Sequence, residues 1–125
     1  MMPHREGELP LDFPADAPIV PSPAEQRRAL LEARWIELTN RDLPGAADAR
    51  RWPIRLNHCF QRVLLDHACG DVWYRHIEGR PAYRHAPEPI LVRALQVGEA
   101  CLKGEMSLVE LNQISLVMRG KVRAR

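Results

Sequence analysis

The sequence predicts an all-α fold, a compact bundle of about five helices with a proline-rich extended N-terminal arm. Three observations support this prediction. Apolar residues recur every three or four positions in several segments, and two serines stand in helix-start motifs. No segment shows the apolar–polar alternation of a strand or the Asn-Gly turn of a hairpin. These features favour helices packed on helices.

The first 22 residues differ in composition from the rest of the chain. Six prolines lie between positions 3 and 23, and the apolar residues among them have no helical period. We therefore expect an extended or disordered arm over residues 1–22 and a single helical domain over residues 23–125. Five apolar side chains of the arm are suited to lie along a groove of the domain: Leu9, Leu11, Phe13, Ile19 and Val20.

The first helix is predicted to run from Pro23 to about Asn40. Ser22 is suited to cap it, because proline fits the first helical position and Glu25 completes a capping box. One face carries three apolar residues: Leu31, Trp35 and Leu38. The sequence Leu43-Pro44-Gly45 is predicted to break the chain, since proline and glycine disfavour a helix interior.

A second helix is predicted from about Asn57 to Gly70, a residue suited to end it. At about 100° per residue, one face carries Leu56, Phe60, Val63, Leu64, His67 and Ala68. The opposite face is a polar stripe of Arg55, His58, Arg62, Asp66 and Cys69. His67 is thus expected at the centre of an apolar, inward face, where a histidine needs a hydrogen-bond partner.

Three further helices are predicted: a short one over residues 72–77, one from Pro87 or Pro89 to Gly104, and one from Ser107 to Arg119. The inner face of the longer middle helix carries Leu91, Ala94, Leu95, Gly98, Cys101 and Leu102. The last helix is apolar on two sides, with Leu108, Leu111, Ile114 and Met118 on one and Val109, Leu116 and Val117 on the other. Such a helix is central in a bundle or covered by a partner.

Composition places the chain among cytoplasmic proteins without a membrane partner. No apolar run approaches the roughly 20 residues of a membrane span, and the N-terminus has no signal-peptide core. The three cysteines lack the spacing of a disulfide framework, which is typical of a reducing compartment. Charge is uneven, because residues 1–23 carry four acids against Arg5 while the remainder of the chain is net basic.

Residues 52–85 hold most of the chemically distinctive side chains, among them four of the five histidines and both tyrosines. Metal binding is one interpretation, but Cys59 and Cys69 lie about 15 Å apart if both are on one helix. No C-x-x-C or H-x-x-x-H pair occurs. We therefore expect no metal and treat Cys59 and Cys101 as small core residues.

Two kinds of functional site remain open. Arginines and aromatic residues predict a surface for a macromolecular partner, made of Arg51, Arg55, His58, Arg62, Trp73, Tyr74 and Arg84. A protein partner, including self-association, is preferred over nucleic acid because the last helix has a second apolar face and the isoelectric point of 8.6 is only moderately basic. The other kind is an internal pocket with weak catalytic candidates: His67, Asp66 and Tyr83.

The runs HCFQRVLLDHACGDVWYRHI, GRPAYRHAP and LNQISLVMRGK resemble a small proteobacterial family that is often described as GCN5-related N-acetyltransferases. The resemblance covers about residues 27–121 and implies acetyl-CoA as cofactor and an amine as acceptor. It also implies a central sheet and an R/Q-x-x-G-x-G/A loop. The nearest glycine-bearing stretch is Arg119-Gly120-Lys121, so no catalytic residue is carried over.

The leading hypothesis from the sequence is accordingly a small helical binding module without a cofactor. The alternatives are an acetyl- or acyltransferase, as the resemblance implies, and a nucleic-acid-binding protein.

Overall fold

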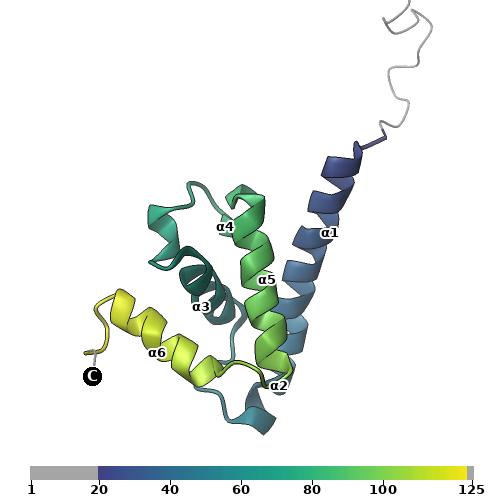
Figure 1. The fold of residues 1–125 in the computed structure, drawn as a ribbon. Helices are drawn as coiled ribbons and strands as arrows, with labels where there is room; N and C mark the ends of the chain where they lie inside the picture. The colour runs from purple at the N-terminus through teal and green to yellow at the C-terminus, as the bar shows by residue number, and fades with distance from the viewer. Residues whose placement is uncertain (1–19, 124–125) are drawn as a thin grey trace, which may run out of the picture.

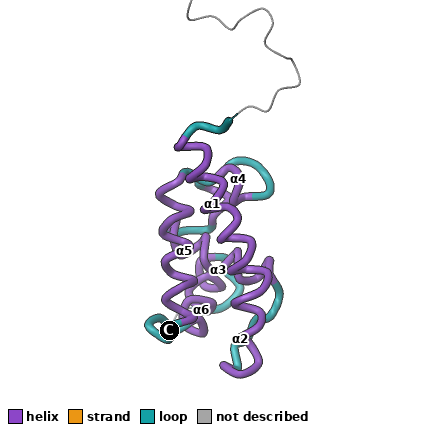
Figure 2. The backbone as a smooth tube through the Cα atoms, turned by 90° about the vertical axis from the view of Figure 1, so that its right-hand side faces the viewer, coloured by secondary structure: helices purple, strands orange, loops and turns teal. Residues whose placement is uncertain are grey.

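A computed structural model describes residues 20–123 of the 125-residue chain, so most of the predicted arm lies outside the described residues. The described elements are helices and turns (Figure 1). In chain order they are α1 (Pro23–Glu37), the π-helical turn η1 (Leu38–Asp42), α2 (Leu43–Arg50), α3 (Asn57–Cys69), the 3-10 turn η2 (Trp73–Arg75), α4 (Ala82–His85), α5 (Glu88–Leu102) and α6 (Leu108–Met118). Residues 20–123 contain no strand (Figure 2), which confirms the all-α prediction.

Helix α5 lies between α1 and α3, and α6 packs on α3 from the other side (Figure 1). The core fills the space where α3, α5 and η1 meet, and its fully buried side chains include Trp35, Leu38, Phe60, Leu64 and Leu91. None of the helices described between residues 20 and 123 is both long and apolar enough to cross a membrane. Helix α3 is therefore covered by neighbours on two sides, and this position decides which of its residues are buried.

The predicted start of the first helix is confirmed in detail. The Ser22 hydroxyl accepts a hydrogen bond from the Glu25 N–H at 3.1 Å, and the Glu25 carboxylate accepts one from the Ser22 N–H at 2.8 Å. This reciprocal pair satisfies two donors at the helix start. The two serine caps and Gly70 place the boundaries of α1, α6 and α3 close to the predicted positions.

The predicted break at Leu43-Pro44-Gly45 is wrong, because the chain stays helical from α1 through η1 into α2. The wide turn η1 makes this continuation feasible. The Leu43 N–H donates to the Leu38 carbonyl, five residues back, and the Thr39 hydroxyl donates to the Trp35 carbonyl at 2.9 Å. Pro44 follows this wide turn directly, at one of the first two positions of α2.

The end of α2 is tied to the end of α5. Arg51 adopts a left-handed conformation with φ of 56°, which ends α2. The preceding Arg50 donates from its guanidinium to the carbonyls of Cys101 and Leu102, at 2.8 and 2.5 Å. These carbonyls belong to the last turn of α5, so a cation supplies further donors to the acceptors at the negative end of that helix.

Gly98 allows α5 to approach η1 and α3 closely. A Cβ atom at this position would lie 2.5 Å from Cδ2 of Leu38 and 3.1 Å from Cδ1 of Leu64. Both leucines are fully buried and have little room to move. Most of the predicted inner face of this helix is confirmed as buried, since only Leu102 of that set is half-buried.

The connection between α3 and α5 is less regular than predicted. The expected helix over residues 72–77 is only the 3-10 turn η2, and the short helix α4 was not expected. Gly79 adopts φ of 113°, and the ring of His85 covers the place where a Cβ atom would be, at 2.6 to 2.8 Å. The connection folds back on itself at Gly79, which only glycine accommodates without strain.

We expect Gly79→Ala to lower the free energy of unfolding by about 1–3 kcal/mol, because alanine is strained at this φ and its methyl group meets His85. Urea denaturation measures the change. The matched control is Gly45→Ala in α2, where nothing lies within 4 Å of the added methyl group. This control should be neutral or stabilising by up to about 1 kcal/mol. Equal effects of the two substitutions would contradict the prediction.

Candidate functional site

A buried carboxylate, Asp66 of α3, is the centre of a polar network between α3 and α6. Its Oδ2 accepts hydrogen bonds from the Ser115 hydroxyl and the Arg119 Nε, both at 2.7 Å. Its Oδ1 accepts from Arg119 Nη2 at 3.0 Å and from the Trp73 N–H at 2.9 Å. Asp66 is fully buried and its four hydrogen bonds compensate for that burial.

A second arginine extends the network by one turn of each helix. Arg62 donates to the Ser115 hydroxyl at 2.6 Å and to the Asn112 side-chain carbonyl at 2.7 Å. Burial lowers the pKa of Arg62 from its ordinary value, while the hydrogen bonds to Asp66 raise the pKa of Arg119. Both arginines are thus committed to contacts within the domain.

This network determines which side of the last helix is buried. The buried residues of α6 are Leu108, Leu111, Asn112 and Ser115. Leu108 and Leu111 belong to the first of the two predicted apolar sides, but Ile114 of that side is 45% exposed, and Val109 of the second side is 50% exposed. The buried side of α6 is therefore partly polar, because α3 offers Arg62 and Asp66 to this part of the helix.

The predicted place of His67 is also wrong. His67 is half-buried, whereas its neighbour Asp66, predicted on the polar stripe, is fully buried. Leu56, predicted inward, is exposed. The physical reason is that α5 and α6 cover α3 on two sides, so the buried arc of α3 extends past its apolar face and includes Leu65 and Asp66.

The three weak catalytic candidates do not form one hydrogen-bonded group. The partners of Asp66 are Trp73, Ser115 and Arg119. Tyr83 lies on α4, where its main-chain carbonyl accepts from Arg28 of α1 at 2.8 Å. Asp66 is thus held on the α6 side of the domain, and the hydrogen bond from Arg28 ties Tyr83 to α1.

Two arginines and two aromatic residues form a continuous row on the surface beside the buried carboxylate. The Arg80 guanidinium lies 5.1 Å from the Trp73 ring centre, and Arg119 lies 5.4 Å from the Tyr74 ring centre. The two rings meet edge to face at 5.7 Å. We call these four residues the aromatic row: Arg80, Trp73, Tyr74 and Arg119.

Asp66 fixes the aromatic row from inside. The Asp66 carboxylate accepts from the Trp73 N–H and from two nitrogens of Arg119. It therefore positions two residues of the row, Trp73 and the arginine that covers the Tyr74 ring. Trp73 is half-buried, but Tyr74 remains 52% exposed. The row therefore presents an exposed aromatic side chain on a rigid support.

The rest of the predicted partner surface is divided between separate places. Arg51, Arg55 and His58 are exposed around the start of α3, about 18 Å along the helix from its end at η2. Arg55 forms an ion pair with Asp48, which is 88% exposed. Arg62 is used within the network, and Arg84 lies 5.9 Å from the Tyr83 ring centre on α4. Only Trp73 and Tyr74 of the predicted set belong to the aromatic row.

Several residues of the network and the row were missed by reading the sequence: Arg80, Asn112, Ser115 and Arg119. A signal for three of them was present. Asn112 and Ser115 of α6 and Arg119 at its C-terminal end follow one another at spacings of three and four, so they form one polar stripe. On α3, Arg62 and Asp66 are four positions apart and also lie on one side of their helix. The hydrogen bonds between the two sets show that these two polar stripes face each other.

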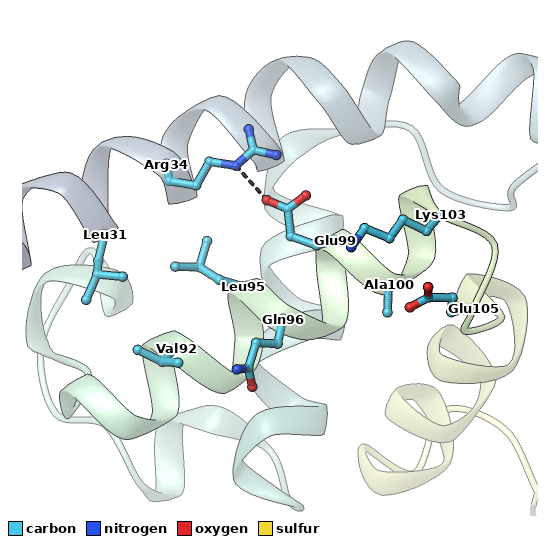
Figure 3. A pocket seen from close by; sticks show the side chains of 9 residues that line it. All are labelled: Leu31, Arg34, Val92, Leu95, Gln96, Glu99, Ala100, Lys103 and Glu105. Atoms are coloured by element: carbon cyan, nitrogen blue, oxygen red, sulfur yellow. Dashed lines mark hydrogen bonds and ion pairs between the residues drawn. The ribbon is translucent and has the colours of Figure 1, made fainter.

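A groove of about 520 Å³ lies between α1 and α5 (Figure 3). Its lining combines an apolar part, made of Leu31, Val92, Leu95 and Ala100, with charged and amide side chains. Across it Arg34 donates to Glu99 at 2.7 Å, and Arg34 also pairs with Asp42 at 2.6 Å. The hydrogen bond from Arg34 holds the pKa of Asp42 below its ordinary value.

The cysteines and histidines do not gather into a metal site within the described residues, where no group of three or more His, Cys, Asp or Glu side chains is placed to hold an ion. Cys101 is buried in α5, and this burial raises the pKa of its thiol to about 11. Cys59 is half-buried. Burial also raises the pKa of Cys69, so neither this thiol nor Cys101 has the depressed pKa of a nucleophilic cysteine.

Comparison of the chain with protein-family models, with curated proteins and with solved structures finds no match. Within residues 20–123, the structure offers a half-exposed aromatic row held by a buried network, and a groove whose lining is partly apolar.

We expect Asp66→Asn to lower the free energy of unfolding by about 2–4 kcal/mol, because the half-buried Arg119 guanidinium loses its fully buried counter-charge. Urea denaturation measures the loss. Asp48→Asn removes the partner of Arg55 at an exposed position and is the matched control. It should change stability by less than about 1 kcal/mol. A tolerated Asp66→Asn would show that the network contributes little.

We expect Cys101 to resist alkylation in the folded protein at pH 8. A thiol pKa raised from 9.0 to about 11 reduces the thiolate fraction about 100-fold, and burial adds a steric barrier. Iodoacetamide labelling followed by peptide mass spectrometry measures the rate at each cysteine. The half-buried Cys59 is the internal comparison. Labelling of Cys101 at the rate seen in urea would refute this expectation.

Proposed function

We propose that this protein is a small helical binding module, and that a partner protein docks on the aromatic row. The observation that supports the proposal is the state of Tyr74, which is half-exposed and yet held by Arg119 on its face and by Trp73 at its edge. A side chain that is already fixed loses little conformational entropy on binding. Tyrosine, tryptophan and arginine are also the residues that most often anchor protein interfaces.

The charges around the row favour a protein over a nucleic acid. A nucleic-acid surface needs several cations free to neutralise phosphates. Arg119 is bound to Asp66, Arg62 is bound to α6, and Arg75 lies 3.4 Å from the Asp71 carboxylate. Asp71 also accepts from His76 at 3.2 Å and so places a negative charge beside the row. The exposed tyrosine, rather than a free cationic track, is the feature available to a partner.

The acetyltransferase implied by the resemblance, the nucleic-acid-binding protein and the cytoplasmic location stay predictions from the sequence. His67, Asp66 and Tyr83 form no shared hydrogen bond among the described contacts. The binding module is the proposal that draws support from contacts in the structure.

Photo-crosslinking in cells of the source organism tests this proposal. We expect p-benzoyl-phenylalanine at position 74 to form a covalent adduct that survives nuclease and disappears with protease. The same residue at the exposed position of Ala49, on α2, is the control and should give no such adduct. An adduct at position 74 that nuclease removes would favour nucleic acid instead, and the absence of any adduct would reject the proposal.

Once the partner is identified, Tyr74→Ala should weaken its affinity at least tenfold, because a central aromatic anchor contributes more than about 1.4 kcal/mol. Titration calorimetry measures the affinity. Leu30→Ala, which also removes an exposed large side chain, is 72% exposed on α1 and should leave the affinity unchanged.

A further inference from the structure

The groove between α1 and α5 exposes apolar surface that no described residue covers. Its apolar lining comes from Leu31 on one wall and from Val92, Leu95 and Ala100 on the other (Figure 3). The salt bridge between Arg34 and Glu99 crosses from one helix to the other. A groove of about 520 Å³ has room for several apolar side chains of a peptide segment.

We propose that residues 9–13 of this same chain occupy the groove and run antiparallel to α1. Their sequence is Leu-Pro-Leu-Asp-Phe. In an extended chain, alternate residues point to one side, so Leu9, Leu11 and Phe13 face the groove together while Pro10 and Asp12 face solvent. The segment thus offers an apolar side to the groove and a polar side to water.

The length of chain before α1 is sufficient for this docking. From Pro23 to Leu31 is a distance of about 12 Å along α1. The seven residue-to-residue steps from Phe13 to Val20 span up to about 23 Å when extended. Phe13 therefore reaches the end of the groove that Leu31 lines, with slack for the turn that reverses the chain.

The segment and the groove also agree in length. Val92 and Lys103 mark the extent of the groove along α5 and lie about 16 Å apart. Residues 9 to 13 extend over about 13 Å. With Phe13 beside Leu31, Leu9 comes close to the opposite end, and Glu8 and Glu6 continue past it.

Charge favours the same arrangement. Residues 1–23 contain four acids and one arginine, whereas residues 24–125 contain seventeen basic and twelve acidic side chains. Of the charges that line the groove, Glu99 is already paired with Arg34, so Lys103 is available to Glu8 at the end where Leu9 lies. Glu105 lines the groove as well, so the charged side chains of the lining cancel, and the attraction for the acidic arm comes from the net positive domain.

Because residues 9–13 are covalently linked to the helical domain, weak contacts are sufficient to keep them in the groove. A tethered segment experiences an effective concentration in the millimolar range, so an affinity that would be negligible between separate molecules still fills the groove. Prolines at positions 10 and 14 reduce the conformational entropy that the segment loses on docking.

Fluorine NMR of the full-length chain tests the proposal, because the protein has two phenylalanines, Phe13 and Phe60. Incorporation of 4-fluorophenylalanine gives two signals, which Phe13→Leu assigns. We expect the Phe13 signal to be shifted from its position in urea. Phe60 is fully buried in α3, away from the groove lining, and its signal reports that each variant is folded.

Two substitutions in the groove should return the Phe13 signal to its position in urea. Val92→Glu places a charge on the apolar lining, and Lys103→Glu repels the acidic segment. Each has a matched control on the C-terminal part of the chain, Val109→Glu and Lys121→Glu, at exposed positions outside the groove. These controls should leave the Phe13 signal shifted.

A Phe13 signal that coincides with its position in urea in the folded wild-type protein would overturn the proposal. A shift that both Val92→Glu and Val109→Glu leave unchanged would overturn it as well. If the shift depends on protein concentration and light scattering shows a dimer, the occupant is the arm of a second copy, and docking within one chain is excluded.

Discussion

The ion pair between Asp66 and Arg119 is the interaction on which the arrangement of half the domain depends. A carboxylate that is fully buried is costly unless its oxygens are saturated with donors. Here the donors are the Trp73 N–H of η2, the Ser115 hydroxyl of α6 and the Arg119 guanidinium at the C-terminal end of α6. The α6 donors are distant from α3 in sequence, so satisfying one charge fixes both the end of α6 and the turn η2 against α3. The exposed row of aromatic side chains depends on that buried contact.

Much of the fold could be predicted because helix starts and ends are local. Ser22 with Glu25, Ser107 and Gly70 determine boundaries through contacts within a few residues. Burial could not be predicted in the same way. The periodicity of α3 indicates one apolar face. In the structure α5 and α6 cover α3 on two sides, so Asp66, which lies outside that apolar face, is buried as well. The rule for proline failed at Pro44 because a wider turn precedes it.

The candidate site could be predicted only in its composition. The concentration of aromatic residues before α4 is visible in the sequence, and Trp73 and Tyr74 lie in the row. What the sequence does not show is which arginine covers which ring. Tyr74 and Arg119 are 45 positions apart in the sequence. They are in contact because the ion pair with Asp66 of α3 holds Arg119, at the end of α6, beside the Tyr74 ring. By contrast, Arg55 forms an ion pair with Asp48, and Arg84 lies over the Tyr83 ring.

The π-helical turn η1 has a consequence for how this chain tolerates changes in length. A π turn contains one residue more than the α-helical turn that it replaces, as an insertion into a regular helix would produce. Each added residue rotates the C-terminal part of the helix by about 100°. Without the extra residue of η1, α2 would present a different face to the domain, and the Arg50 side chain would no longer point at the last carbonyls of α5. The number of residues in this turn, rather than any single side chain there, keeps these two helices in register.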